Sequence, residues 1–327
     1  MRALIVADSD AHIGEGHGVR MLNLARMLQQ RGISVTWVYL NMTDRIQQEL
    51  AALESEPVVT LQKVPLPEAL HQTVANMKPD ICVIDGYDYD RSLYETAYVS
   101  AKCSVVFDDL ANRPIKAHIL VDGSLVRKQT DYGRWINDDA QLLVGAEYLV
   151  MHPDFSQEHL ASIKPAVVHV FFGSTDSGQS TYKALKQLLE SKLDVQISVI
   201  TTALTHDLKA IRELDKQHES LTLIHEPSSL YQSLNGATLA LGAPGTATWE
   251  RMAMGVFPLL YSFNDEQKTI LQKLHALGVI HYLGDIDELG HCAEAVSHWL
   301  NHPTCGDSMI DGQGCRRVVD AVMEYVQ

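Results

Sequence analysis

One glycine-rich segment combines residue types suited to close ligand approach and to proton transfer. Asp8, Gly14, Gly16 and His17 follow an apolar run at residues 3–7. Glycine allows the backbone to turn tightly and to lie close to a ligand. A histidine at the start of the next helix can act as a general base near neutral pH, so His17 is a catalytic candidate. Asp8, at the start of the same loop, is named as a second catalytic candidate. The alternative is a plain turn in which His17 only caps the helix.

Two later segments, each between an apolar run and a helical pattern, have the composition of anion sites. Backbone N–H groups at the start of a helix can bind phosphate without a charged side chain. Glu250 lies about one turn into its helix, where a carboxylate can accept two ribose hydroxyls. Ordinary helix capping is the alternative in both segments. The candidate residues are Gly173, Ser174 and Thr175 in the first segment, and Gly245, Thr246, Ala247 and Glu250 in the second.

Polar residues also follow other apolar runs. Asp108, Asp109 and Arg113 are predicted to form a local ion pair that shapes their loop rather than to catalyse a reaction. Tyr87 and Asn264 occupy equivalent places after two further runs, and each is a weak candidate when taken alone.

Several other chemistries lack their sequence signals. The glycines from residue 14 to 18 have the spacing GxGxG, whereas dinucleotide-binding proteins have GxGxxG. There is no GxSxG segment of the kind that presents a serine nucleophile. The 15 histidines are interpreted as scattered and without an HxxxH-type cluster, so no metal and no other cofactor is expected.

Predicted strands and helices, which must position these residues, alternate along all 327 residues. Strands with apolar residues on both faces are typical of a parallel sheet covered by helices. Strands are predicted at 3–7, 34–40, 58–63, 80–85, 103–107, 118–121, 141–144, 166–172, 195–201, 221–225, 237–241, 257–262 and 278–282. Helices are predicted at 18–31, 43–54, 67–77, 90–101, 179–192, 205–217, 227–235, 246–254, 264–276, 287–300 and 312–326.

The repeated strand–helix units predict an α/β protein with two Rossmann-like domains whose parallel sheets face each other across a cleft. We expect domains at 1–150 and 151–327, with the C-terminal helix packing back towards the first domain. Ligands of such sheets bind beyond the carboxyl ends of the strands, where all the candidate residues lie.

Composition narrows the possible partners. Lys and Arg number 26 and Asp and Glu number 41, so the formal charge is −15. That charge argues against a nucleic-acid or anionic-membrane partner. No apolar run reaches the ~18 residues of a membrane span, and a strand at the start leaves no room for a signal peptide. Five cysteines with no CxxC pair indicate a reducing compartment, so a cytoplasmic protein is expected. We also expect a monomer.

Taken in order, four segments resemble the PseG-type nucleotide-sugar hydrolases. Those enzymes hydrolyse UDP-2,4-diacetamido-2,4,6-trideoxy-β-L-altropyranose in pseudaminic acid biosynthesis. The resemblance extends to the final helix, and the joint order of the segments is more specific than any one of them. The segments are 13–20, 108–113 with Asp122, 173–176 and 242–251.

The resemblance implies a GT-B fold like that of the MurG-type glycosyltransferases, with UDP on the second domain and the sugar facing the first. It also implies metal-independent cleavage, in which His17 activates a water that attacks the anomeric carbon with inversion. Tyr87 and Asn264 match positions that line the sugar site, and Glu250 matches the ribose-binding acid. The loops near Gly173 and Gly245 match those that bind the diphosphate.

The sequence departs from the family pattern at four positions, which leaves the sugar open. Pro244 also removes one backbone N–H. A GT-B glycosyltransferase with a hydroxyl acceptor would use the same donor site and the same histidine, and a UDP-sugar-binding protein without activity is a third hypothesis. The departures are Val6 and His152 where arginine is usual, and Ser174 and Pro244 where glycine is usual.

Overall fold

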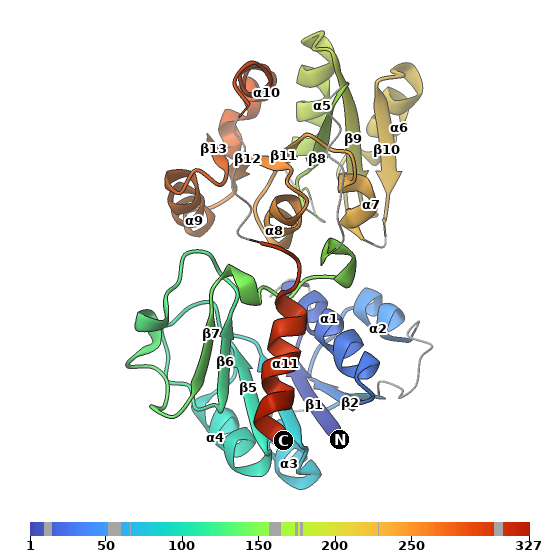
Figure 1. Ribbon diagram of the computed structural model, residues 1–327. Helices are drawn as coiled ribbons and strands as arrows, with labels where there is room; N and C mark the ends of the chain where they lie inside the picture. Colours follow the sequence, from blue (N-terminus) through green and yellow to red (C-terminus); the bar gives the residue numbers. More distant parts are fainter. Residues whose placement is uncertain are drawn as a thin grey trace. The chain divides into compact units, whose positions relative to one another are not determined.

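The computed structural model divides the chain into two compact units, each with one parallel sheet (Figure 1). Unit 1 comprises Met1–Pro153 and Gly312–Gln327, and unit 2 comprises Asp154–Asp311. The alternation of strands and helices confirms the predicted α/β class. The structure describes residues 1–9, 15–51, 60–65, 67–156, 165–173, 176, 179–227, 229–303 and 310–327.

Unit 1 has a seven-stranded sheet in the order β3-β2-β1-β4-β5-β6-β7. Its strands are β1 (Arg2–Ala7), β2 (Ser34–Tyr39), β3 (Thr60–Lys63), β4 (Ile81–Asp85), β5 (Cys103–Phe107), β6 (Ile119–Asp122) and β7 (Gln141–Val144). Its α-helices are α1 (Gly16–Gln30), α2 (Asp44–Ala51), α3 (Pro67–Met77), α4 (Arg91–Ser100) and α11 (Gly314–Val326). Short 3₁₀ helices lie at Gln129–Tyr132 and Ala146–Tyr148.

Strand β1 shows how the unit 1 sheet is buried on both faces. Ala3 and Ile5 belong to the apolar cluster under α1, α2 and α11, whereas Leu4 and Val6 belong to the cluster under α3 and α4. Successive side chains of a strand point to opposite faces, so a continuous apolar run is required here. Figure 1 shows α11 beside α1 within this unit.

Unit 2 has a six-stranded sheet in the order β10-β9-β8-β11-β12-β13. Its strands are β8 (Ala166–Phe171), β9 (Val195–Thr201), β10 (Leu221–His225), β11 (Leu239–Gly242), β12 (Phe257–Ser262) and β13 (His281–Asp285). Its α-helices are α5 (Ser180–Glu190), α6 (Leu208–Gln217), α7 (Leu230–Leu234), α8 (Thr246–Ala253), α9 (Asp265–Ala276) and α10 (Cys292–Asn301). Short 3₁₀ helices lie at Pro153–Ser156 and Ile286–His291.

Strand β13 begins three residues later than the sequence predicts. Gly278 has φ +73°, and Val279 donates its N–H to the Leu274 carbonyl in a turn that closes α9. This turn belongs to the group of glycine-containing helix ends that satisfy the last carbonyls. Val279 and Ile280 are buried by it before the strand starts, so apolar character alone misplaced the boundary.

Two further properties follow from the described residues. No helix among them has both the length and the apolar composition to span a lipid bilayer. Cys82, Cys103, Cys292 and Cys315 are buried and unpaired; Cys305 lies outside the described residues.

Candidate functional site

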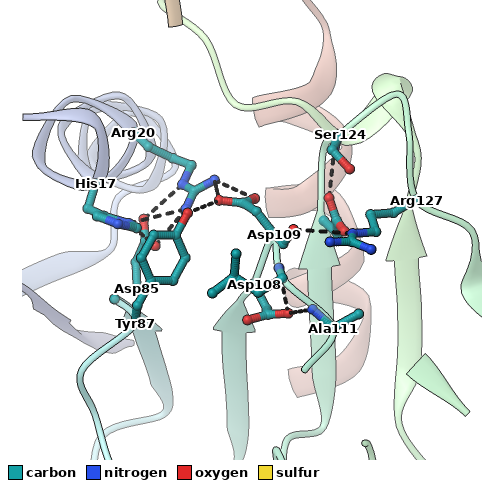
Figure 2. Close-up of polar contacts among 12 residues, drawn as sticks. His17, Arg20, Asp85, Tyr87, Asp108, Asp109, Ala111, Ser124 and Arg127 are labelled. Atoms are coloured by element: carbon teal, nitrogen blue, oxygen red, sulfur yellow. Dashed lines mark hydrogen bonds and ion pairs between the residues drawn. The ribbon is translucent and has the colours of Figure 1, made fainter. Parts of the chain in front are cut away.

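The carboxyl ends of β1, β4 and β5, which are neighbours in the unit 1 sheet, gather a network of charged side chains (Figure 2). His17 comes from the first turn of α1, and its Nδ1 lies 2.7 Å from Oδ1 of Asp85, the last residue of β4. Arg20, one turn further along α1, binds both oxygens of Asp85 at 2.7 and 2.8 Å. His17 and Arg20, each 65 or more positions from Asp85 in the sequence, thus share its carboxylate.

The backbone of α1 explains why His17 can reach this position. A Cβ atom on Gly18 would lie 2.9 Å from Ser9 and 3.1 Å from Ile46. Glycine at this position therefore lets the first turn of the helix pack closely against the segment after β1. The Cβ of Gly16, in contrast, would meet nothing within 4 Å.

The charges of the network fix the protonation of its members. Asp85 is fully buried, which would raise the pKa of its carboxyl, but the charge of Arg20 and the hydrogen bonds from His17 and Arg20 lower that pKa to about 2. An ionised carboxylate can only accept hydrogen bonds, so Nδ1 of His17 carries the hydrogen and donates it. In this tautomer Nε2 of His17 has a lone pair and can accept a proton.

Tyr87 and Asp109 extend the network on the other side of Arg20. The Tyr87 ring meets the His17 ring edge-on, with centroids 4.5 Å apart. Its hydroxyl donates to Asp109 at 2.9 Å, and the two oxygens of Asp109 lie 3.0 and 3.1 Å from Nη1 of Arg20. Burial and the Asp109 charge raise the pKa of Tyr87, so its hydroxyl stays neutral.

The neighbouring loop confirms one prediction and adds a buried acid. Asp108 pairs with Arg113 at 2.7 Å, as expected, and accepts the N–H groups of Leu110 and Ala111. The Tyr132 hydroxyl lies 3.0 Å from Oδ2 of Asp108 and 2.8 Å from Oδ2 of Asp122. One hydroxyl hydrogen cannot satisfy both carboxylates.

Asp8 lies outside this network. Its Oδ1 accepts the N–H groups of Leu40 and Asn41 at 2.6 and 2.9 Å, and its Oδ2 accepts the Tyr89 hydroxyl at 3.0 Å. These contacts connect the end of β1 to the end of β2 and to the segment after β4. The carboxylate of Asp8 is therefore engaged in holding loops, which the sequence could not indicate.

In unit 2, β8 and β11 are paired, and the predicted anion residues follow their carboxyl ends. Gly173 has φ +95° and Gly245 has φ +129°, and a Cβ on either would meet nothing within 4 Å. Gly245 is the N-cap of α8 and has no capping side chain. In α8, Thr246 is exposed, Ala247 is buried and Glu250 is half-buried. Gly14, Ser174 and Thr175 lie outside the described residues.

Asn264 is the N-cap of α9, and its side chain accepts the N–H of Gln267 at 2.8 Å. This contact is the ordinary capping interaction that the residue type favours. Its place in a sugar site stays a prediction.

The histidines of unit 2 are less scattered than the sequence interpretation held. The rings of His275 and His281 have centroids 5.1 Å apart. His298 on α10 and His302, the residue that caps the end of α10, have the HxxxH spacing, and their ring centroids lie 4.8 Å apart. Within the described part of the chain, no group of three or more His, Cys, Asp or Glu has the geometry to hold a metal ion.

Sequence reasoning missed Asp85, Arg20 and Asp109 as parts of the site around His17. Asp85 ends an apolar run and resembles any strand terminus. Asp109 was assigned to a local pair, although its partners are Arg20 and Tyr87. A charged residue at the end of a fully buried strand was the available signal, because such a charge requires a partner.

Comparison with models of known protein families finds no match. An uncharacterized protein of Methanocaldococcus jannaschii is 19% identical over 277 residues, covering 81% of this chain but only 56% of that protein. The UDP-2,4-diacetamido-2,4,6-trideoxy-beta-L-altropyranose hydrolase of Campylobacter jejuni is 21% identical over 236 residues, 72% of this chain and 82% of the hydrolase. The spore coat polysaccharide biosynthesis protein SpsG of Bacillus subtilis is 21% identical over 347 residues, 100% of this chain and 99% of SpsG.

Solved structures share the fold. MurG of Acinetobacter baumannii has a TM-score of 0.64 at 13% identity, with 99% of both chains covered. The UDP-GlcNAc 2-epimerase of Neisseria meningitidis, solved with UDP-GlcNAc bound, has a TM-score of 0.64 at 12% identity, with 99% of this chain and 100% of the epimerase covered. The predicted GT-B fold is confirmed, and at these identities the likeness establishes the fold alone.

Proposed function

We propose that this chain is a hydrolase of UDP-activated sugars, in which unit 1 supplies the base and unit 2 supplies the nucleotide-binding loops. The observation that carries the proposal is the contact between Nδ1 of His17 and the buried carboxylate of Asp85 at 2.7 Å. A carboxylate that holds one ring nitrogen orients the imidazole and stabilises it after it has taken a proton.

In the proposed reaction, Nε2 of His17 takes a proton from a water molecule as the water oxygen bonds to the anomeric carbon. The bond from that carbon to the phosphate oxygen breaks, its electron pair leaves with UDP, and the configuration inverts. Because UDP is a good leaving group, the protein needs chiefly to position the water and to stabilise the charge that develops on the diphosphate.

Tyr87 is placed to contribute to this step through its contact with His17. The edge-on ring limits how the imidazole can rotate, and the hydroxyl is held by Asp109. With 41% of its surface exposed, Tyr87 also has area left to contact a sugar. We assign it a positioning and sugar-lining role.

For unit 2 we propose that the loops at Gly173 and Gly245–Ala247 bind the diphosphate and that Glu250 binds the ribose. The open space beside both glycines and the uncapped start of α8 support this assignment. An uncapped helix start has backbone N–H groups without partners inside the helix, and an anion can accept hydrogen bonds from them.

For the sugar, we propose a 2,4-diacetamido-2,4,6-trideoxyhexose, and hence a place in nonulosonic acid biosynthesis such as that of pseudaminic acid. The motif order and the similarity to the Campylobacter jejuni hydrolase support this choice. We also propose that the protein acts as a monomer without a metal ion.

The test is release of UDP from a panel of UDP-amino-sugars with water as the only acceptor, followed by NMR. We expect fast release from the diacetamido-trideoxy donor, with inversion and in the presence of EDTA. His17→Ala should lower the turnover by about 10²–10⁴-fold and leave the affinity for UDP nearly unchanged. The matched control is His71→Ala, because His71 also lies near a carboxylate of unit 1, Asp90, but is partly exposed.

Near-normal turnover by His17→Ala would remove His17 as the base. Loss of activity in EDTA that a divalent cation restores would contradict the metal-independent step. Tight UDP binding with slow release across the whole panel would favour transfer to a hydroxyl acceptor.

A further inference from the structure

Arg251 is a fully buried guanidinium group that is bound by backbone carbonyls. Its Nη2 donates to the Phe171 carbonyl at 2.8 Å, and its Nη1 donates to the Ala243 carbonyl at 3.1 Å. Its Nε, also buried, has no hydrogen-bond partner. In the described part of the chain, no carboxylate lies within ion-pair distance of it.

The position of this guanidinium connects the two loops assigned to the diphosphate. Phe171 is the last residue of β8, two positions before Gly173, and Ala243 lies two positions before Gly245. Side chains on a helix lean towards its N-terminus, so Arg251 reaches back from the second turn of α8 to these carbonyls. A Cβ on Gly242 would lie 2.8 Å from Nη2 of Arg251 and 1.8 Å from the Phe171 carbonyl oxygen, so only glycine leaves room here.

The electrostatic surroundings leave the charge of Arg251 largely uncompensated. Burial lowers its pKa to about 10, although the charge of Glu250 acts in the opposite direction. His169, which is buried on β8, has its pKa lowered by burial and by Arg251, so it stays neutral. A buried charge without a counter-charge is costly to a folded protein. A ligand with negative charge beside the loops would offset that cost.

We infer that Arg251 is the buried positive charge that draws the diphosphate of the ligand to the loops after β8 and β11. It acts through its field and through the two carbonyls that it holds, and it is a positioning residue that does not touch the ligand. The inference rests on the proposed function, from which it takes the diphosphate. Two independent features point to one place: the uncapped start of α8 and a buried cation with an unused donor.

The test measures the binding of inorganic pyrophosphate, UDP and uridine to the full-length protein by calorimetry. In Arg251→Met we expect the affinities for pyrophosphate and UDP to fall about tenfold or more, because the buried positive charge beside the two loops is lost. The affinity for uncharged uridine should stay within about twofold of the parent. The control Arg212→Met removes the same charge from an exposed position on α6 and should leave all three affinities unchanged.

Arg251→Lys keeps the inference testable if the methionine variant does not fold. A buried lysine loses its proton more readily than arginine. The affinity of this variant for pyrophosphate should therefore fall from pH 7 to 8.5 relative to the parent protein, whereas its affinity for uridine should not.

Three outcomes would overturn the inference. These are unchanged pyrophosphate affinity in Arg251→Met, an equal loss for uridine and pyrophosphate, or a pH profile of Arg251→Lys that matches the parent. An equal loss would mean that Arg251 only shapes the loops. Pyrophosphate binding that depends on Arg251 in a protein that releases no UDP would leave the inference standing while the proposed reaction failed.

Discussion

The two units treat a buried guanidinium in opposite ways. Arg20 in unit 1 is bound by the carboxylates of Asp85 and Asp109, so its charge is neutralised within the protein. Arg251 in unit 2 is bound by the carbonyls of Phe171 and Ala243, which supply dipoles but no negative charge. The first arrangement fixes the geometry around His17, while the second leaves a charge for a ligand to balance.

This difference separates two uses of a buried cation. A guanidinium between two carboxylates is rigid and well satisfied, because its fork matches the paired oxygens of each. A guanidinium that binds only carbonyls costs more free energy when the protein is empty, and that cost is recovered when an anion binds. Sites that orient a base and sites that attract an anion therefore need opposite charge balances.

The largest expected effect comes from removing a carboxylate that neutralises Arg20, which brings its charge balance closer to that of Arg251. Asp85→Asn leaves Arg20 and His17 without their shared anion, and we expect the free energy of unfolding to fall by about 3–5 kcal/mol. Urea denaturation at pH 7 measures this loss. In the control Asp320→Asn, which breaks a half-exposed pair with Arg31, the change should stay below about 1 kcal/mol. Equal losses in the two variants would contradict a special role for the Asp85 carboxylate.

Asp122 extends the comparison of compensated and uncompensated buried charges from a cation to an acid. In the described residues, no cation lies within ion-pair distance of its carboxyl group. Burial and the Asp109 charge raise the pKa of Asp122 to about 6. Between pH 3.8 and about 6, the folded protein therefore keeps a proton on Asp122 that the unfolded chain has released. Its contribution to stability is complete below that pH and is lost as the pH rises through about 6.

The stability difference between the parent and Asp122→Asn should accordingly fall by about 2 kcal/mol from pH 4 to pH 7. Urea denaturation at several pH values measures it. The control Asp139→Asn alters an exposed carboxyl whose pKa is lowered, chiefly by the Asn137 side chain. That difference should be flat over the same range, and a flat profile for Asp122→Asn as well would show that Asp122 is ionised throughout.

The smallest expected effect concerns a polar side chain with a purely structural contact. Asn264→Ala removes the cap of α9 and should lower the free energy of unfolding by about 1 kcal/mol. Asn264→Asp keeps an acceptor at the cap and should stay within about 0.5 kcal/mol of the parent. If the alanine variant also loses turnover by more than tenfold, Asn264 has the additional sugar-lining role that the family resemblance implies.

Much of the fold could be predicted because burial on both faces of a sheet makes its strands continuously apolar. The runs at 81–84 and 103–107 are such strands, and the Asp108–Arg113 pair follows because its partners are close in the sequence. The start of β13 could not be predicted, because the turn at Gly278 buries two apolar residues that do not belong to the strand.

The site was less accessible to sequence reasoning because its contacts cross the sheet. His17 and Asp85 meet only because β1 and β4 are neighbours, and the order of the strands is not written in either segment. The same holds for Asp8, which contacts Tyr89 across 81 positions, and for Arg251, which binds Phe171 across 80.

The return of α11 to unit 1 has a consequence for the order in which the chain can acquire its structure during synthesis. Unit 2 is one continuous stretch, whereas the core of unit 1 includes Val318, Val319 and Val322 near the end of the chain. A ribosome therefore delivers all of unit 2 before the apolar side of α1 receives its cover. Unit 1 begins first but is completed last. The risk of aggregation is greatest during the interval in which its apolar face is exposed.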